Sequence, residues 1–386
     1  MANHAITHTF RGVLYIPTAW VSLCLFTTKA VEGLELRNRQ KPDTPLFLCS
    51  KRNINLTSPI LGVWRTYLYG MKERILQLDY LKGVFILLMV IFHLSLIEQT
   101  YPLLREAVYT FHMSAFLIIS GYLANVEKDI RTFGHSMLRL IIPYFIFEAI
   151  YILMLFFLGK TMHTTNSIEN LTILSFMDRI AEHPTGPYWY IHTLIICTIV
   201  YFIVYKVFKL KKITGLILTG FILYGLTLVI AGFSWANVIY FLIGIYLLRC
   251  GKSFMEMISP SLLAVLPLCI LFSSSDNFNR GSLAGIAITI LVISFLLYVY
   301  TYCPNRMKRF LFYLGKNSLA IVVFSPIFTV ATKLAVPYFS FDQTAICFVT
   351  SALCFVVACC LFSAWLCDKI HISKLVFFKD NFYIEY

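Results

Sequence analysis

The sequence has little charge for its length. Only 13% of its 386 residues are Asp, Glu, Lys or Arg, whereas 59% are hydrophobic, and the mean hydropathy is +0.77. Soluble domains carry about 25% charged residues, so the composition excludes a soluble protein of this size. It predicts instead a polytopic, all-α integral membrane protein, most of which lies in the lipid.

Other patterns are missing as well. The 11 cysteines form no CxxC pair and no Cys/His metal spacing, so we expect neither a disulfide framework nor a metal site. Most of them lie in apolar segments, where cysteine behaves as a small apolar residue. No internal repeat is visible, which disfavours a transporter built from inverted repeats. No soluble basic domain is present that would bind nucleic acid.

The sequence contains many long apolar segments. We predict about ten transmembrane helices in one bundle, although the sixth and seventh segments are short for a span. The ten segments are 78–98, 107–124, 137–158, 188–207, 213–231, 235–249, 258–272, 282–302, 310–332 and 344–367. The short loops on one side hold eleven Lys and Arg residues, and those on the other side hold five. By the positive-inside rule both ends of this core are cytoplasmic, which indicates an inner (plasma) membrane protein in contact with lipid.

The chain divides into three parts. Residues 1–70 are polar and contain four prolines, and Met71 begins a run typical of the start of an inner-membrane protein. We interpret residues 1–70 as an N-terminal extension or as a start assigned too early. Residues 71–370 form the transmembrane domain, and 371–386 form a cytoplasmic tail without a readable motif. The polar loop 159–187 is either a lid or a plain connector.

Two ionisable residues stand in the first span. Lys82 and His93 are eleven residues apart, about three helical turns, so they share one face about 16 Å apart along the axis. Asp79 lies near the same face. Ionisable side chains are costly in a membrane and mark functional sites, so this stripe indicates a site more than helix packing.

Three histidines lie well inside predicted spans. The topology places His93, His112 and His192 at similar depth in the outer half of the membrane, and Lys82 and Arg139 near the inner edge. Glu148 lies about 15 Å along the third span from Arg139. For His112, His192 and Glu148, helix-packing contacts are the alternative explanation.

Five stretches resemble one family when they are taken in order. They are Arg74-x4-Asp79 with Lys82-x10-His93, the segment from Phe111 to Tyr122 (FHMSAFLIISGY), Arg139 to Tyr144 (RLIIPY), Gly186 to His192 (GPYWYIH), and Leu314 to Ile321 (LGKNSLAI). Together they resemble the membrane-bound acyltransferase 3 family, and within it the branch of fucose 4-O-acetylase-like, surface-glycan O-acetyltransferases.

The resemblance implies an enzyme that moves an acetyl or other acyl group from acyl-CoA to a hydroxyl. The expected cosubstrate is acetyl-CoA, the expected acceptor is a cell-surface or lipid-linked carbohydrate, and no metal is implied. It makes His93 the catalytic histidine, places His112 beside it, and makes Arg139 the basic residue before the Pro-Tyr pair.

We assign roles by depth. The cations near the inner face, Lys82, Arg139, Arg131 and Lys128, would meet the phosphates of coenzyme A. His93 is the first choice for the base that takes the proton of the acceptor hydroxyl, because imidazole titrates near neutral pH. An acyl-histidine intermediate is the alternative chemistry.

The remaining predicted site residues are assigned to the base or to the acceptor. Asp79, Glu148 or His112 would orient or tune the base. His192, Trp189 and Tyr190 are assigned to the acceptor side, and an interfacial aromatic belt accounts for them equally well.

One position departs from the family pattern, which usually continues from SLAI to a Leu-His pair. Here the run reads SLAIVVFSP, with Ser325 at the place of the histidine. This keeps two alternatives open, a relative without activity and a non-catalytic partner in glycan export. A transporter or flippase of glycan or lipid-linked sugar is the rival function class.

Overall fold

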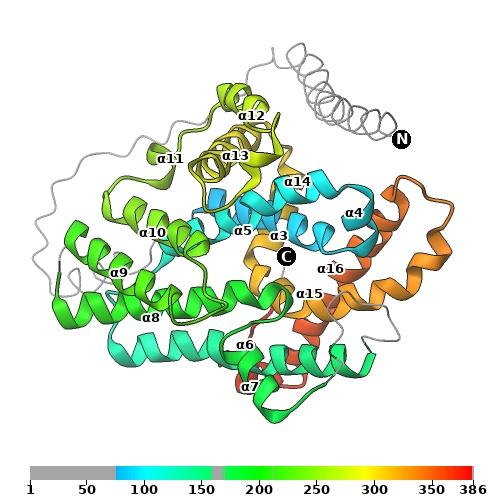
Figure 1. Ribbon diagram of the computed structural model, residues 1–386, viewed down its shortest axis with the longest axis horizontal. Coiled ribbons are helices and arrows are strands. Elements are labelled where there is room, and N and C mark those ends of the chain that lie inside the picture. Colours follow the sequence, from blue (N-terminus) through cyan, green and yellow to red (C-terminus); the bar gives the residue numbers. More distant parts are fainter. Residues whose placement is uncertain (1–74, 159–167, 169, 211, 385–386) are drawn as a thin grey trace, which may run out of the picture. The chain divides into compact units, whose positions relative to one another are not determined.

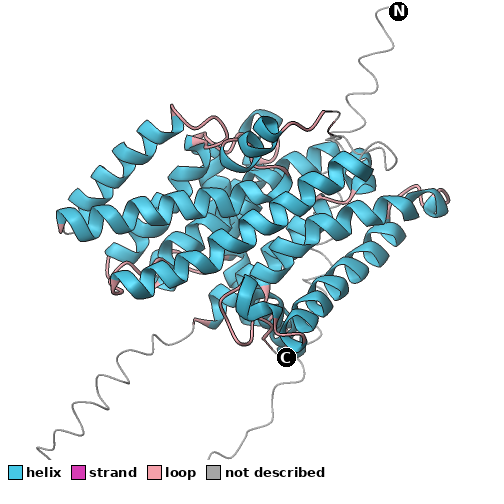
Figure 2. Ribbon diagram, turned by 90° about the horizontal axis from the view of Figure 1, so that it is seen from below, coloured by secondary structure: helices cyan, strands magenta, loops and turns pink. Residues whose placement is uncertain are grey.

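The computed structural model describes residues 75–158, 168, 170–210 and 212–384 (Figures 1 and 2). Within these ranges every regular element is a helix, and no strand occurs. The predicted extension 1–70 lies outside the described residues. Described residues 75–384 therefore form an all-helical unit, as the composition predicts.

The first half of the unit runs from α3 to α9. The bounds are α3 (Leu76–Phe92), α4 (Ser95–Thr100), α5 (Pro102–Leu123), α6 (Ile130–Leu158), α7 (Ile173–Ala181), the 3-10 turn η1 (Gly186–Tyr188), α8 (Trp189–Phe208) and α9 (Lys212–Thr227).

The second half runs from α10 to α17. The bounds are α10 (Trp235–Arg249), α11 (Phe254–Met257), η2 (Leu262–Ala264), α12 (Val265–Leu271), η3 (Ser275–Phe278), α13 (Leu283–Tyr302), α14 (Asn305–Lys316), α15 (Ser318–Thr332), η4 (Lys333–Phe339), α16 (Ile346–Lys369) and α17 (Ile372–Val376).

Five helical segments of the described chain are long and apolar enough to cross a membrane. They are Ile130–Leu158, Gly186–Phe208, Leu283–Tyr302, Ser318–Phe339 and Ile346–Lys369. Three shorter apolar helices, Ile213–Thr227, Trp235–Arg249 and Leu262–Leu271, coincide with three further predicted segments. The molecule is therefore a membrane protein with several spans, and the count of ten stays a prediction.

Two predicted segments are interrupted. The apolar run 310–332 is not one helix, because α14 ends at Lys316 and α15 begins at Ser318. The Asn317 amide between them donates to the carbonyls of Tyr313 and Ile384, so it closes α14 and ties the joint to the C-terminal segment. The first segment also ends earlier than predicted, since His93 is the C-cap of α3 and α4 follows.

Glycines let the central helices approach backbone to backbone. A Cβ on Gly83 of α3 would collide with the Leu311 carbonyl of α14, and one on Gly315 with the Asp79 carbonyl of α3. These two helices and α5 lie together in the middle of the unit (Figure 1). This close crossing fixes the basic helix α14 against the helix that carries Lys82 and His93.

Loops predicted on the same side of the membrane contact one another. On the predicted inner side, the Arg249 guanidinium lies 3.7 Å from the Glu127 carboxylate and its Nε donates to the Tyr201 hydroxyl. On the predicted outer side, the Thr110 hydroxyl donates to the Phe278 carbonyl. The contacts agree with the predicted grouping of loops, and the assignment of one group to the cytoplasm stays a prediction.

Candidate active site

Two of the predicted histidines meet across one tyrosine. Tyr109 of α5 lies between them, with its ring centroid 5.6 Å from that of His93 and 5.3 Å from that of His112. The Tyr109 hydroxyl donates to the Phe92 carbonyl at 2.9 Å, which attaches the end of α3 to α5. The structure therefore brings together the two histidines predicted to lie side by side, and it adds Tyr109 as the residue that positions them.

Both histidines hold their rings in the same way. Nδ1 of His93 contacts the Met89 carbonyl at 2.6 Å, and Nδ1 of His112 contacts the Val108 carbonyl at 2.7 Å. A carbonyl only accepts, so each Nδ1 carries a proton, and in the neutral form of such a ring the lone pair is on Nε2. His112 is 3% exposed, and its Nε2 has no hydrogen-bond partner among the described residues.

A buried polar atom without a partner costs about 1–3 kcal/mol. Native structures rarely keep such an atom without a role in binding or catalysis. The geometry at His112 is suited to accepting a proton from a hydroxyl group brought to it.

An arginine adds positive charge beside this pair. The Arg280 guanidinium stacks over the Trp189 ring at 5.1 Å, donates to the Asn237 side-chain oxygen at 3.3 Å, and lies within electrostatic reach of His112. A second guanidinium, that of Arg105, lies 5.7 Å from the Tyr109 ring. Both arginines lie just before predicted spans, Arg105 before 107–124 and Arg280 before 282–302, so their proximity to the histidines is a finding of the structure.

The third predicted histidine belongs to a different cluster. The His192 ring packs on Tyr144 at 5.8 Å, and its Nε2 bonds the Ala181 carbonyl at 3.0 Å. Tyr144 donates to the Ile180 carbonyl at 2.6 Å, and the fully buried Glu148 carboxylate accepts the Thr185 N–H at 2.6 Å. These groups hold the segment 180–185, which precedes the turn at η1.

The remaining predicted aromatic residues connect the two ends of α5. Trp189 lies under Arg280, and the Tyr190 hydroxyl is 2.8 Å from the Ser120 hydroxyl. The Tyr190 ring also packs on Phe116 at 5.8 Å. Ser120 lies eight residues from His112 on α5, about 12 Å along the helix axis.

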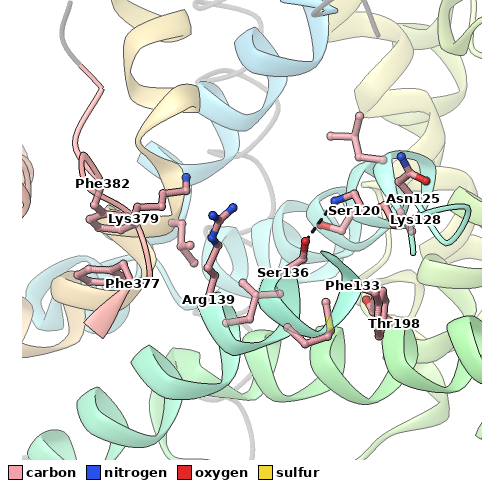
Figure 3. Close-up of a pocket in the computed structure, with 15 residues that line it drawn as sticks. Ser120, Asn125, Lys128, Phe133, Ser136, Arg139, Thr198, Phe377, Lys379 and Phe382 are labelled. Carbon is pink, nitrogen blue, oxygen red and sulfur yellow. Dashed lines mark hydrogen bonds between the residues drawn. The ribbon is translucent and has the colours of Figure 1, made fainter. Parts of the chain in front are cut away.

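Ser120 is also part of the wall of a cavity of about 300 Å³ (Figure 3). The cavity lies between the end of α5, the start of α6, α8 and the C-terminal segment. Its lining includes Lys128 and Arg139, two of the four cations predicted for the coenzyme. Figure 3 shows both side chains at its edge, with the Lys128 ammonium bonded to the Ser136 hydroxyl at 3.2 Å.

The other two predicted cations lie elsewhere. Lys82 forms an ion pair of 2.7 Å with Asp79, and the Lys82 side chain is 20% exposed. Asp79 is thus paired with Lys82 in the N-terminal half of α3, and Asp79 lies fourteen residues or about 21 Å from His93. Arg131 is exposed and does not line the cavity.

A possible metal-binding group is present in the described chain at the end of α7. It consists of Asp178, Glu182 and His183, all three exposed, with His183 and Asp178 3.2 Å apart. It shares no residue with the histidine pair or with the cavity.

Ser325, at the position where the family pattern has histidine, lies close to the site. It is 1% exposed on α15, and its hydroxyl is 4.0 Å from the Met89 sulfur. Met89 also provides the carbonyl that accepts from His93. Met89 therefore contacts both Ser325 and His93, so the position that departs from the pattern is separated from the predicted base by a single residue in space.

Sequence reasoning missed Tyr109, Arg280 and Lys379. The first two lie beside the histidines, and Lys379 lines the cavity. Tyr109 lies three residues before His112, and this spacing places the two side chains next to each other on one helix, so it could have pointed to Tyr109. No local signal marked Arg280 or Lys379.

The comparisons identify the family of the chain. No curated protein and no solved structure matches the chain. A family model described as an acyltransferase domain matches residues 75–365, a range that contains both histidines, Arg280, Lys128 and Arg139. Because this range is most of the chain, the protein belongs to the acyltransferase 3 family and is a membrane acyltransferase.

Proposed function

We propose that the protein transfers an acetyl or other acyl group from cytoplasmic acyl-CoA to a hydroxyl of a cell-surface or lipid-linked carbohydrate, within the inner (plasma) membrane. The observation that carries this proposal is the pair of histidines around Tyr109, each of which is held through Nδ1, near the middle of α5. The cation-bearing cavity lies at the C-terminal end of the same helix.

The donor would enter from the cavity. Phosphate groups pair favourably with the Lys128 ammonium and the Arg139 guanidinium, and the cavity lining contains no carboxylate to oppose them. The thioester end of the donor would extend along α5, past Ser120 and Tyr190, toward the histidines. The distance of about 12 Å between Ser120 and His112 is the length that this arm has to cover.

Transfer would use His93 as the base. Its Nε2 removes the proton of the acceptor hydroxyl while the hydroxyl oxygen attacks the thioester carbonyl carbon. The carbon–sulfur bond then breaks, the acyl group stays on the acceptor oxygen, and the leaving thiolate takes the proton from the imidazolium. Arg280, as a cation beside His112, would stabilise negative charge on the carbonyl oxygen during the attack.

The test is acyl transfer in membranes from radiolabelled acetyl-CoA to total glycan and lipid-linked sugar. Wild type is compared at matched expression with His93→Ala and with His135→Ala, which removes an exposed histidine of α6. Loss of a general base costs about 10²- to 10⁴-fold in rate, so we expect this loss for His93→Ala and wild-type transfer for His135→Ala. Equal transfer by wild type and His93→Ala contradicts the assigned base.

The same membranes distinguish the two chemistries. An acyl-histidine intermediate would leave label on the protein when acceptor is absent, and that label would disappear with His93→Ala. A general-base mechanism leaves no label on the protein. Failure of wild type to transfer label from any acyl-CoA, with the donor intact, contradicts the proposed donor.

A further inference from the structure

The C-terminal segment 377–384 is bound to the helices by side chains that are specific for its backbone. The Asp368 carboxylate at the end of α16 accepts the N–H groups of Phe382 and Tyr383, at 2.9 and 2.8 Å. Two hydrogen bonds to one ionised carboxylate are stronger than bonds between neutral groups. The segment is therefore held in one conformation at this point.

A second attachment lies at the joint of α14 and α15. The buried Asn317 amide donates to the Ile384 carbonyl at 2.9 Å and accepts the Ile384 N–H at 2.9 Å. These are the two hydrogen bonds that the backbone of a paired β-strand residue exchanges with its neighbour. The hydroxyls of Tyr313 and Tyr383 are 2.6 Å apart. Only a side chain with both a donor and an acceptor satisfies the Ile384 backbone in this way.

Aromatic packing completes the attachment. The rings of Phe377 and Phe382 are parallel with centroids 3.6 Å apart, and the Phe377 ring packs on Phe147 of α6 and Phe324 of α15. Phe377 is 1% exposed and Phe382 is 6% exposed. This degree of burial is that of a core element and not that of a solvated tail.

The segment forms one wall of the cavity. Phe377, Lys379 and Phe382 line it from this side, opposite Lys128 and Ser120 (Figure 3). The lining thus holds three basic side chains and no carboxylate. The acidic residue of the segment, Asp380, is instead exposed and pairs with Lys374 at 3.3 Å.

The segment also orients the arginine of the cavity. The Phe378 carbonyl accepts the Nε–H of Arg139 at 3.1 Å. Phe378 has φ +51°, a left-handed conformation that costs a bulky residue about 1–3 kcal/mol and persists where surrounding contacts enforce it. The hydrogen bond fixes Nε of Arg139 against the segment and leaves the two terminal nitrogens as further donors of a side chain that lines the cavity.

We propose that residues 377–384 complete a phosphate-binding site, in which Lys379 joins Lys128 and Arg139 and the Phe378 carbonyl orients Arg139. This inference rests on the proposed acyl-CoA donor and specifies what binds its phosphates. The ligand chemistry is a phosphate group carrying more than one negative charge. Three cations that line one cavity match that charge.

The test measures coenzyme A binding to the full chain in phosphatidylcholine nanodiscs by calorimetry. Lys379→Met is compared with Lys374→Met, which removes an exposed lysine of the same region. One hydrogen bond between charged groups contributes enough for about a tenfold change in Kd. We expect Lys379→Met to raise the Kd of coenzyme A about tenfold and Lys374→Met to leave it unchanged. Asn317→Leu, which releases Ile384, is expected to raise it as well.

Steady-state kinetics show whether the effect of Lys379→Met depends on the phosphate groups of the donor. Lys379→Met should raise the KM for acetyl-CoA and leave the KM for acetyl-pantetheine, a thioester without phosphate groups, at the wild-type value. An equal loss with both donors, or an unchanged Kd for coenzyme A, overturns the inference while leaving the proposed function intact. Absence of coenzyme A binding by wild type overturns the donor of the proposed function and this inference with it.

A lipid headgroup is the other possible source of phosphate. The binding experiment is therefore repeated in nanodiscs that contain phosphatidylglycerol. If coenzyme A binds wild type and Lys379→Met equally in phosphatidylcholine, and only phosphatidylglycerol binding responds to the substitution, the site belongs to a lipid. That result overturns this inference and leaves the proposed function intact.

Discussion

Among the described residues, two buried polar clusters contain histidines, and the two clusters differ in which part of the chain accepts or donates their hydrogen bonds. In the cluster around Tyr109, both histidines donate Nδ1–H to carbonyls four residues back in their own chain. In the cluster of Glu148, Tyr144 and His192, the polar groups bond the backbone of segment 180–185. The second cluster stabilises a loop, whereas in the first each Nδ1 is held by a carbonyl of its own chain. Among the described residues, each cluster also contains a buried histidine nitrogen without a hydrogen-bond partner, Nε2 of His112 and Nδ1 of His192.

The hydrogen-bond partners distinguish a histidine that fastens a loop from one that is held by its own chain. Burial alone does not, because His112 is 3% exposed and His192 is 7% exposed. The distance in sequence between the partners is more informative. A ring bonded to its own helix is oriented without fastening another segment, and a ring bonded to a distant loop fastens that loop.

The largest effect expected from this comparison is on the rate. His112→Ala should lower acyl transfer by about 10²-fold or more, because it removes a basic nitrogen beside the proposed base. His192→Ala should leave the rate within a few-fold of wild type, since its Nε2 bonds the Ala181 carbonyl. Both are measured with radiolabelled acetyl-CoA at matched expression. A larger rate loss for His192→Ala than for His112→Ala would reverse the assignment of the two clusters.

The next effect is on stability. Glu148→Ala leaves the buried Thr185 N–H without its acceptor and should lower the free energy of unfolding by about 1–3 kcal/mol. Thermal unfolding in detergent, with limited proteolysis at the segment after α7, measures this change. Glu148→Gln keeps a side-chain oxygen as acceptor and serves as the matched variant. If Glu148→Ala unfolds at the wild-type temperature, the carboxylate does not hold the loop.

A smaller effect is expected for the residue that positions the histidines. Tyr109→Phe keeps the ring between His93 and His112 and loses only the bond to the Phe92 carbonyl, which contributes about 1 kcal/mol. We expect kcat to fall several-fold with little change in the KM for the donor, because the cavity is unaltered. A change confined to the KM would show that Tyr109 contacts the donor and does not position the base.

The smallest effect is expected at Ser325. Its hydroxyl lies 4.0 Å from the Met89 sulfur, a weak contact, so Ser325→Ala should leave the melting temperature near the wild-type value and change the transfer rate by less than a factor of two. Differential scanning fluorimetry and the transfer assay measure these quantities. A rate loss as large as that of His112→Ala would mean that the serine has replaced the histidine of the family pattern in the reaction.

Much of the fold and part of the site could be predicted from the sequence. Apolar length predicted several of the membrane helices, and the family resemblance placed His112 beside His93, where both rings pack on Tyr109. The prediction grouped His192 with the other two histidines because all three have similar depth, but depth does not give the direction in which a side chain points. Tyr144 and the segment after α7 decide that direction.

Other features depend on contacts between distant parts of the chain. Arg280 reaches Trp189 from ninety-one positions away, and Arg139 meets Phe378 from 239 positions away. No pattern within either stretch specifies these pairs. The break between α14 and α15 was missed for a related reason, since Asn317 reads as one polar residue in an apolar run until its bond to Ile384 is seen.

The attachment of Ile384 to Asn317 has a consequence for the order of synthesis. The histidine pair is complete once residues 76–123 have left the ribosome, because His93, Tyr109 and His112 all belong to that stretch. The wall of the cavity is complete only after α16 has been inserted and residues 377–384 have followed it. During translation the newly made protein therefore assembles its proposed base long before its proposed donor site, and a ribosome that stops after α16 would release a chain that has the first without the second.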